Sequence, residues 1–135
     1  LLEAGIPHSD DQVIWGNVSQ KSGYEMAQTA LNTTTTPTAL FTVNNFVAIG
    51  AFAYLREAGL SVPEDVSIVT FDELPNSLMS ESFLTSIQQP AQKIGQEATR
   101  LLLNRISGEM SDDCQQIVLP TSMIIGNSTK AISDP

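Results

Sequence analysis

The chain has 135 residues, of which 41% are hydrophobic and 16% are charged, and its mean hydropathy is near zero. These values are typical of one globular domain and exclude an intrinsically disordered chain. Acidic residues outnumber lysines and arginines 15 to 6, which gives a formal net charge of -9. Because a chain this acidic repels phosphates, we do not expect it to bind nucleic acid or an anionic membrane by itself. No stretch approaches the roughly 20 apolar residues of a membrane span.

Cys114 is the single cysteine, so an internal disulfide is excluded. We interpret it as an ordinary surface cysteine beside Asp112 and Asp113 in a reducing compartment, which predicts a cytoplasmic protein. The sequence begins at Leu1 without a methionine or a signal peptide, and we expect it to be a piece of a longer protein.

Strand-like and helix-like patterns alternate along the chain, which predicts an α/β fold with helices crossing over a parallel sheet. In chain order we expect a strand at 12–15, a helix at 19–31, a strand at 39–43, a helix at 46–58 and strands at 66–71 and 83–87. A long helix follows, with Pro90 as its first residue and Gly108 directly after its end. Late strands are expected at 117–119 and 122–125. Residues 127–135 are predicted to form a frayed tail. The long helix after Pro90 is predicted to bury one apolar face, which consists of Ile94, Ala98, Leu101, Leu102 and Ile106.

Polar residues follow three of the predicted strands. Ligands of open parallel sheets bind beyond the carboxyl ends of the strands, and this rule selects Asn17, Val18, Asn44 and Asp72. A carboxylate beside an amide suits a ligand rich in hydroxyls. The alternative is that Asn44 only caps its helix and Asp72 only turns a loop.

The predicted helix at 46–58 is apolar on all sides up to Arg56. A helix that lies on a sheet needs only one apolar stripe, so a second side of this helix must also be covered. Ile49 and Phe52 are costly to expose, and Leu78 and Met79 are expected to extend the same patch. We therefore favour an interface on this helix over a solvent-exposed face.

An enzyme is not expected. The sequence contains no nucleophile elbow, phosphate-binding loop, dinucleotide fingerprint or Cys-x-x-Cys pair, and His8 is its only histidine. Asp72 and Glu73 are adjacent and point in different directions in an extended loop, so they do not form a catalytic pair. No metal site and no cofactor are predicted.

Several ordered motifs resemble the lactose/galactose-repressor (LacI/GalR) family. They are PTALFTVNNFVAIG at 37–50, LREAGLSVPEDVSIVTFD at 55–72, LTSIQQP at 84–90, the helix from Ile94-Gly95 to Leu103, VLPT at 118–121 and NST at 127–129. Each motif is weak alone, but their order and spacing hold over nearly the whole chain. The resemblance is to the C-terminal part of the effector-binding core.

The resemblance implies a type I periplasmic-binding-protein-like fold, a parallel-sheet α/β sandwich of two lobes with a ligand cleft between them. Residues 1–87 would form most of the C-terminal lobe. Residues 88–114 would contain a hinge and a helix of the N-terminal lobe, and residues 115–135 a hinge strand, a late strand of the C-terminal lobe and the tail. The rest of the N-terminal lobe and a helix-turn-helix head would lie outside this sequence.

The resemblance also implies roles for individual residues. Asn44 and Asp72 match the family's effector-binding positions. Val18 matches a position that often carries an aromatic ring over the ligand, and Asn17 beside it is expected at the same site. Gln89 matches a hinge position that can face the cleft and contact the effector. The dimer contacts of the family match Ile49, Phe52, Ala53, Leu78 and Met79.

The implied function is an effector-binding and dimerisation fragment of a transcriptional repressor. Its partners would be a sugar or sugar phosphate, a second copy of the protein, and operator DNA through the head. The main alternative is a secreted sugar-binding receptor of the same fold that serves a transporter or a sensor.

Overall fold

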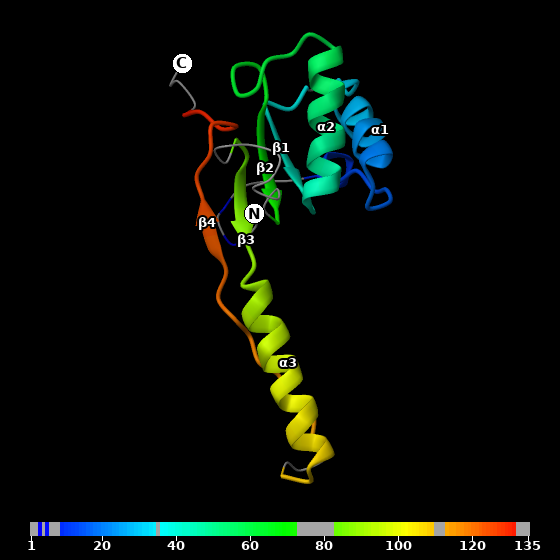
Figure 1. Ribbon diagram of the computed structural model, residues 1–135. Coiled ribbons are helices and arrows are strands. Elements are labelled where there is room, and N and C mark those ends of the chain that lie inside the picture. The colour runs from blue at the N-terminus through cyan, green and yellow to red at the C-terminus, as the bar shows by residue number, and fades with distance from the viewer. Residues whose placement is uncertain are drawn as a thin grey trace.

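The structure is a computed structural model that describes residues 3, 5, 9–34, 36–72, 83–109 and 113–131. Its elements are a 3-10 helix (Asp10–Gln12), α1 (Gln20–Leu31), β1 (Ala39–Thr42), α2 (Asn45–Glu57), β2 (Ser67–Phe71), β3 (Thr85–Gln88), α3 (Ala91–Ile106) and β4 (Ser122–Ile124). Figure 1 shows α1 and α2 together on one side of the sheet, whereas α3 projects away from it like an arm.

The four strands form one sheet in the order β1-β2-β3-β4. β1, β2 and β3 are parallel to their neighbours, as predicted, whereas β4 is antiparallel to β3. The direction of β4 follows from the path of the chain, because the segment after α3 returns along this helix and enters the sheet from the opposite end (Figure 1).

The core lies between α2 and the sheet. It consists of Ala48, Leu55, Val66, Ile68 and Leu84. Burial alternates along β2, so every second residue of this strand is fully buried. Each fully buried leucine or isoleucine contributes roughly 1.5–3 kcal/mol to folding.

The helices begin and end at residues that their sequences mark. The Ser19 side chain accepts a hydrogen bond from the Ser22 backbone N–H and caps α1. Gly59 follows α2 with φ +75°, a left-handed conformation that glycine adopts without strain. α3 ends before Gly108, as predicted, but Pro90 is its N-cap and not its first helical residue.

The strand predicted at 12–15 is wrong. Gln12 belongs to the 3-10 helix, and residues 13–17 form no strand. The Gln12 side chain accepts a hydrogen bond from the Ser9 backbone N–H at 3.1 Å, which closes a local turn and competes with extended pairing. Trp15, which the predicted strand would have contained, is 88% exposed.

The predicted buried face of α3 is also wrong, because no residue of this helix is buried. Ile106, for example, is 73% exposed. The return segment runs beside the helix, and Arg105 Nη2 donates a hydrogen bond to the Asp113 carbonyl at 3.0 Å. That segment contains residues 117–119, which were predicted as a strand and form none.

The predicted frayed tail is wrong for residues 127–131, which dock onto the sheet. Ser128 is fully buried, and its Oγ donates to the Ile68 carbonyl at 2.6 Å and accepts from the Thr85 N–H at 2.8 Å. The Ile68 N–H donates in turn to the Ser128 carbonyl at 2.9 Å. Ser128 therefore joins β2 to the start of β3.

Candidate functional site

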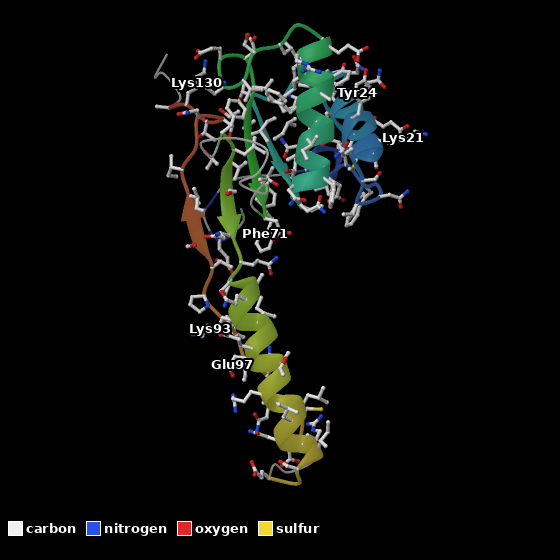
Figure 2. The ribbon with its side chains drawn as sticks, in the orientation of Figure 1. Lys21, Tyr24, Phe71, Lys93, Glu97 and Lys130 are labelled. Carbon is white, nitrogen blue, oxygen red and sulfur yellow. The ribbon has the colours of Figure 1, made fainter. Side chains whose placement is uncertain are left out.

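Asp72 lies directly after β2, at the end of the sheet from which α3 projects. Figure 2 shows Phe71 at this end and Lys130 at the opposite end. Asp72 has φ 71°, a left-handed conformation that aspartate tolerates better than most residues. Its backbone N–H donates to the Ile87 carbonyl at 3.0 Å, so hydrogen bonding between the strands continues up to Asp72. These two features fix the backbone from which the half-buried Asp72 side chain extends.

Gln89 contacts Asp72 directly. Gln89 Nε2 donates to Asp72 Oδ1 at 2.6 Å, and both residues are half-buried. The two residues are 17 positions apart in the chain, and the parallel pairing of β2 with β3 brings them to one edge. Two of the predicted effector-binding residues therefore form a charge-assisted pair.

Asn44 lies on the neighbouring strand connection. Thr42 of β1 pairs with Thr70 of β2, and Asn44 and Asp72 each follow their strand residue by two positions. Asn44 is the N-cap of α2, and its Oδ1 accepts from the Val47 N–H at 3.0 Å. The capping alternative is therefore correct for the amide oxygen. The cap does not use Asn44 Nδ2, so capping and ligand binding are compatible.

A row of buried hydroxyl groups, which was not predicted from the sequence, lies on the three strands that precede these residues. Thr42, Thr70 and Ser86 are register partners on three adjacent strands, and all three are buried. Ser86 Oγ has no hydrogen-bond partner among the described residues. A hydroxyl residue stands two positions before a polar residue at or just after the end of each strand (Asn44, Asp72 and Gln88), and this repeated spacing is a signal that could have found the row.

Val18 and Asn17 lie in the turn that precedes α1. Val18 is 62% exposed, and the Asn17 N–H donates to Ser22 Oγ at 2.9 Å. Among the described residues, no hydrogen bond joins either of them to Asn44 or Asp72. The structure therefore brings Asp72, Gln89 and Asn44 to one edge and leaves Val18 and Asn17 beside α1.

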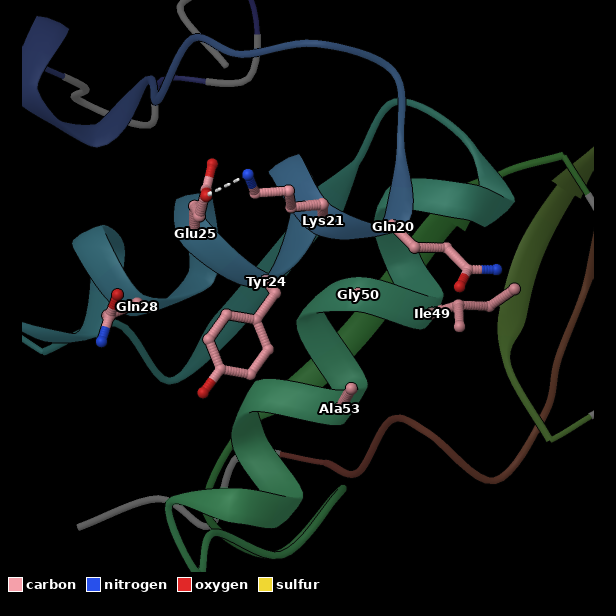
Figure 3. A pocket seen from close by; sticks show the side chains of 8 residues that line it. All are labelled: Gln20, Lys21, Tyr24, Glu25, Gln28, Ile49, Gly50 and Ala53. Atoms are coloured by element: carbon pink, nitrogen blue, oxygen red, sulfur yellow. Dashed lines mark ion pairs between the residues drawn. The ribbon is translucent and has the colours of Figure 1, made fainter.

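A separate surface pocket of about 540 Å³ lies between α1 and α2. Figure 3 shows its lining, which consists of Gln20, Lys21, Tyr24, Glu25, Gln28, Ile49, Gly50 and Ala53. Lys21 and Glu25 form an exposed ion pair at 3.8 Å across its rim. A hydrogen bond to the Glu57 carboxylate raises the pKa of the Tyr24 hydroxyl, and desolvation adds to this effect.

The residues predicted for the dimer interface lie in different surroundings. Ile49 and Ala53 line the pocket between α1 and α2. Phe52 packs against the core, with its ring 5.3 Å from that of Phe83. Leu78 and Met79 lie outside the described residues, as do His8 and Glu73.

No helix among the described residues is long and apolar enough to span a bilayer. The same residues contain no group of three or more histidine, cysteine or acidic side chains that could hold a metal ion.

Comparison with known proteins identifies the family. Residues 1–129 match the model of the periplasmic binding protein-like domain. The chain is 38% identical over 112 residues to the HTH-type transcriptional repressor PurR of Photorhabdus laumondii, covering 83% of this chain and 33% of that protein. It is 36% identical over 131 residues to PurR of Pasteurella multocida, covering 97% of this chain and 39% of that protein. The chain thus spans little more than a third of the length of these transcription repressors.

Solved structures agree with this assignment. The transcription regulator CcpA of Lactococcus lactis has a TM-score of 0.81 and 29% identity, over 96% of this chain and 46% of that one. A complex of the transcriptional regulator CelR with cellobiose has a TM-score of 0.84 and 29% identity, over 94% of this chain and 38% of that one. A LacI-family regulator of Enterococcus faecium with bound ribose has a TM-score of 0.70 and 32% identity, over 82% and 40%. The chain belongs to the periplasmic binding protein-like domain family and corresponds to the effector-binding domain of LacI/GalR-type regulators.

Proposed function

We propose that this chain binds a small effector, a sugar or sugar phosphate, within a dimeric transcriptional repressor. The observation that carries the proposal is the contact between Asp72 and Gln89 at the carboxyl edge of the sheet, beside Asn44. The carboxylate accepts hydrogen bonds from ligand hydroxyls, and the Asn44 amide nitrogen donates one. The ribose and cellobiose complexes of structural neighbours support the choice of a sugar.

The lobes divide the chain as the family resemblance implies. Residues 1–87 and the late strand within 115–135 belong to one lobe, whereas 88–114 contain the hinge and a helix of the other. The projection of α3 from the sheet and the absence of buried residues in it support this division. An effector at Asp72 therefore lies where the chain crosses between the lobes, close to Gln89. For Val18 and Asn17, which lie in the turn before α1, the proposed effector contact rests on the family resemblance alone, because no hydrogen bond among the described residues joins them to Asn44 or Asp72.

Regulation then requires no covalent chemistry. An effector that binds the closed arrangement of the lobes more tightly than the open one shifts the population toward the closed state. In a dimer, this shift changes the spacing of two helix-turn-helix heads that bind operator DNA in the cytoplasm. A coupling free energy of about 1–3 kcal/mol changes DNA affinity roughly 5- to 150-fold.

Asp72→Ala tests the site. We expect it to weaken the binding of ribose or cellobiose to the full-length protein by about 1–3 kcal/mol, because charged hydrogen bonds are lost. Isothermal titration calorimetry measures the change. Asp65→Ala is the control, since it removes the same charge from the loop at the opposite end of β2. An unchanged affinity of Asp72→Ala, or a wild-type protein that binds neither these sugars nor their phosphates, would contradict the proposal.

Ile49→Glu tests the dimer. Ile49 and Ala53 line the pocket between α1 and α2, and a partner subunit that packs there would meet a buried, unpaired carboxylate in the variant. We expect sedimentation of the full-length protein to show monomers. Thr36→Glu introduces the same charge in the exposed loop before β1 and should leave the dimer intact. A dimer that persists in Ile49→Glu would exclude this face of α2 as the dimer interface.

A further inference from the structure

We propose that Gln89 is a positioning residue, whose amide holds the Asp72 carboxylate and connects it to the start of α3. This inference rests on the proposed function, because it assigns ligand contact to Asp72. It differs from a ligand-binding role for Gln89 itself. Gln89 acts here only through its neighbour.

The Asp72 carboxylate is held from two sides. Its backbone is fixed by the hydrogen bond to the Ile87 carbonyl and by its left-handed conformation. Its side chain is fixed by Gln89 Nε2, which donates to Oδ1 at 2.6 Å. The Gln89 bond satisfies one carboxylate oxygen and leaves the other to accept from a ligand. A carboxylate that is already oriented loses less entropy when the ligand binds.

Gln89 is also part of the turn that starts α3. Its carbonyl accepts from the Ala91 N–H at 2.8 Å, and the Pro90 carbonyl accepts from the Ile94 N–H at 2.9 Å. Since proline fixes its own φ, few backbone rotations separate the Gln89 side chain from the first turn of the helix. A displacement of the Asp72 carboxylate is therefore passed directly to the direction of α3.

A double-mutant cycle separates positioning from direct ligand contact. We expect Gln89→Leu to weaken ribose or cellobiose binding to the full-length protein about tenfold, by loss of one charge-assisted hydrogen bond. In the Asp72→Ala background the same substitution should change the affinity less than about twofold, since Gln89 then has nothing to orient. Additive effects in the double variant would overturn the inference, because they would mean that Gln89 contacts the sugar.

A distance measurement tests the link to α3 without any ligand. Cys114 is the one cysteine of the chain, is exposed, and follows the residue that Arg105 contacts at the far end of α3. Spin labels on Cys114 and on an introduced Arg56→Cys, which lies in the last turn of α2, report the distance between the arm and the sheet layer. The labelled chain is diluted with unlabelled chain, so that only distances within one molecule are measured.

We expect one narrow distance distribution in the parent chain and a clearly broader one in Gln89→Leu. The exchanged pair Asp72→Asn with Gln89→Glu restores an amide opposite a carboxylate, so it should restore the narrow distribution. An equally narrow distribution in Gln89→Leu, or no rescue by the exchanged pair, would overturn the inference. If Asp72→Ala leaves sugar binding unchanged while these distances behave as expected, the proposed function fails and the link to α3 stands.

Discussion

Gly50 and Gly23 let α1 and α2 pack with their backbones in close contact. A Cβ atom on Gly50 would lie 2.7 Å from the Tyr24 backbone nitrogen and closer still to the Gln20 carbonyl oxygen. A Cβ on Gly23 would lie 2.8 Å from the Val47 Cα. The neighbouring atoms are backbone atoms in both cases, so neither helix can make room by changing a rotamer.

Gly50→Ala is therefore expected to destabilise the chain by about 2 kcal/mol or more, since overpacking outweighs the gain in helix propensity. Gly95→Ala is the matched control, because Gly95 is also helical and has no atom near the position of a new Cβ. That variant should be neutral or more stable by up to about 1 kcal/mol. Urea unfolding measures both changes. Equal effects of the two substitutions would contradict the packing argument.

At the scale of single elements, the docked segment 127–131 shows how a short polar stretch completes a sheet. Ser128 supplies both a hydroxyl and a backbone carbonyl to β2, and its hydroxyl also accepts from Thr85. Thr129 adds a hydroxyl contact to Thr85 at 2.9 Å. Lys130 contacts the Glu64 carbonyl and, at 3.4 Å, the Glu64 carboxylate. The segment thereby satisfies backbone groups that would otherwise be buried without partners.

Ser128→Ala should lower the free energy of unfolding by about 2 kcal/mol, because it leaves the Thr85 N–H without its acceptor in a buried site. Ser122→Ala makes the same change at an exposed position of β4 and should cost less than about 0.5 kcal/mol. Thermal and urea unfolding compare the two variants. A Ser128→Ala chain as stable as Ser122→Ala would show that the segment contributes no stability.

The sequence predicted the elements whose signals are local. Ser19, Asn44 and Gly59 mark helix ends through their own side chains or φ angles, and a run of β-branched and aromatic residues marks β2. The strand predicted at 12–15 and the frayed tail failed for the opposite reason. Whether a short apolar or polar segment pairs with a sheet depends on a neighbour that is remote in the chain.

The candidate site shows the same limit. The rule for parallel sheets selected Asn44 and Asp72 correctly as residues of one edge, because register follows from strand order. The hydrogen bond between Asp72 and Gln89 depends on one side-chain geometry, to which no sequence pattern points. The buried row of Thr42, Thr70 and Ser86 was missed because hydroxyl residues in strands are usually attributed to β propensity.

At the scale of the whole molecule, the chain consists of a sheet layer with two helices and one projecting arm. The apolar periodicity of α3 correctly indicates an amphipathic helix, but it does not supply the surface on which that helix would lie. Among the described residues, only the return segment runs beside it (Figure 1). The stability of α3 therefore comes mainly from its own backbone hydrogen bonds.

An isolated helix of this length is marginally stable in water, because helices in proteins are stabilised mostly by packing of their apolar face. We therefore expect the backbone amides of α3 to exchange with deuterium at least 100-fold faster than those of α2 around Leu55, whose opening requires exposure of the core. Two-dimensional NMR of the chain at micromolar and millimolar concentrations measures both helices in one sample. If the amides of α3 are protected from exchange as strongly as those of α2, and if this protection increases with protein concentration, a second copy of the chain covers Leu102 and Ile106. Equal protection at every concentration would mean that the arm folds back onto its own sheet, contrary to the structure.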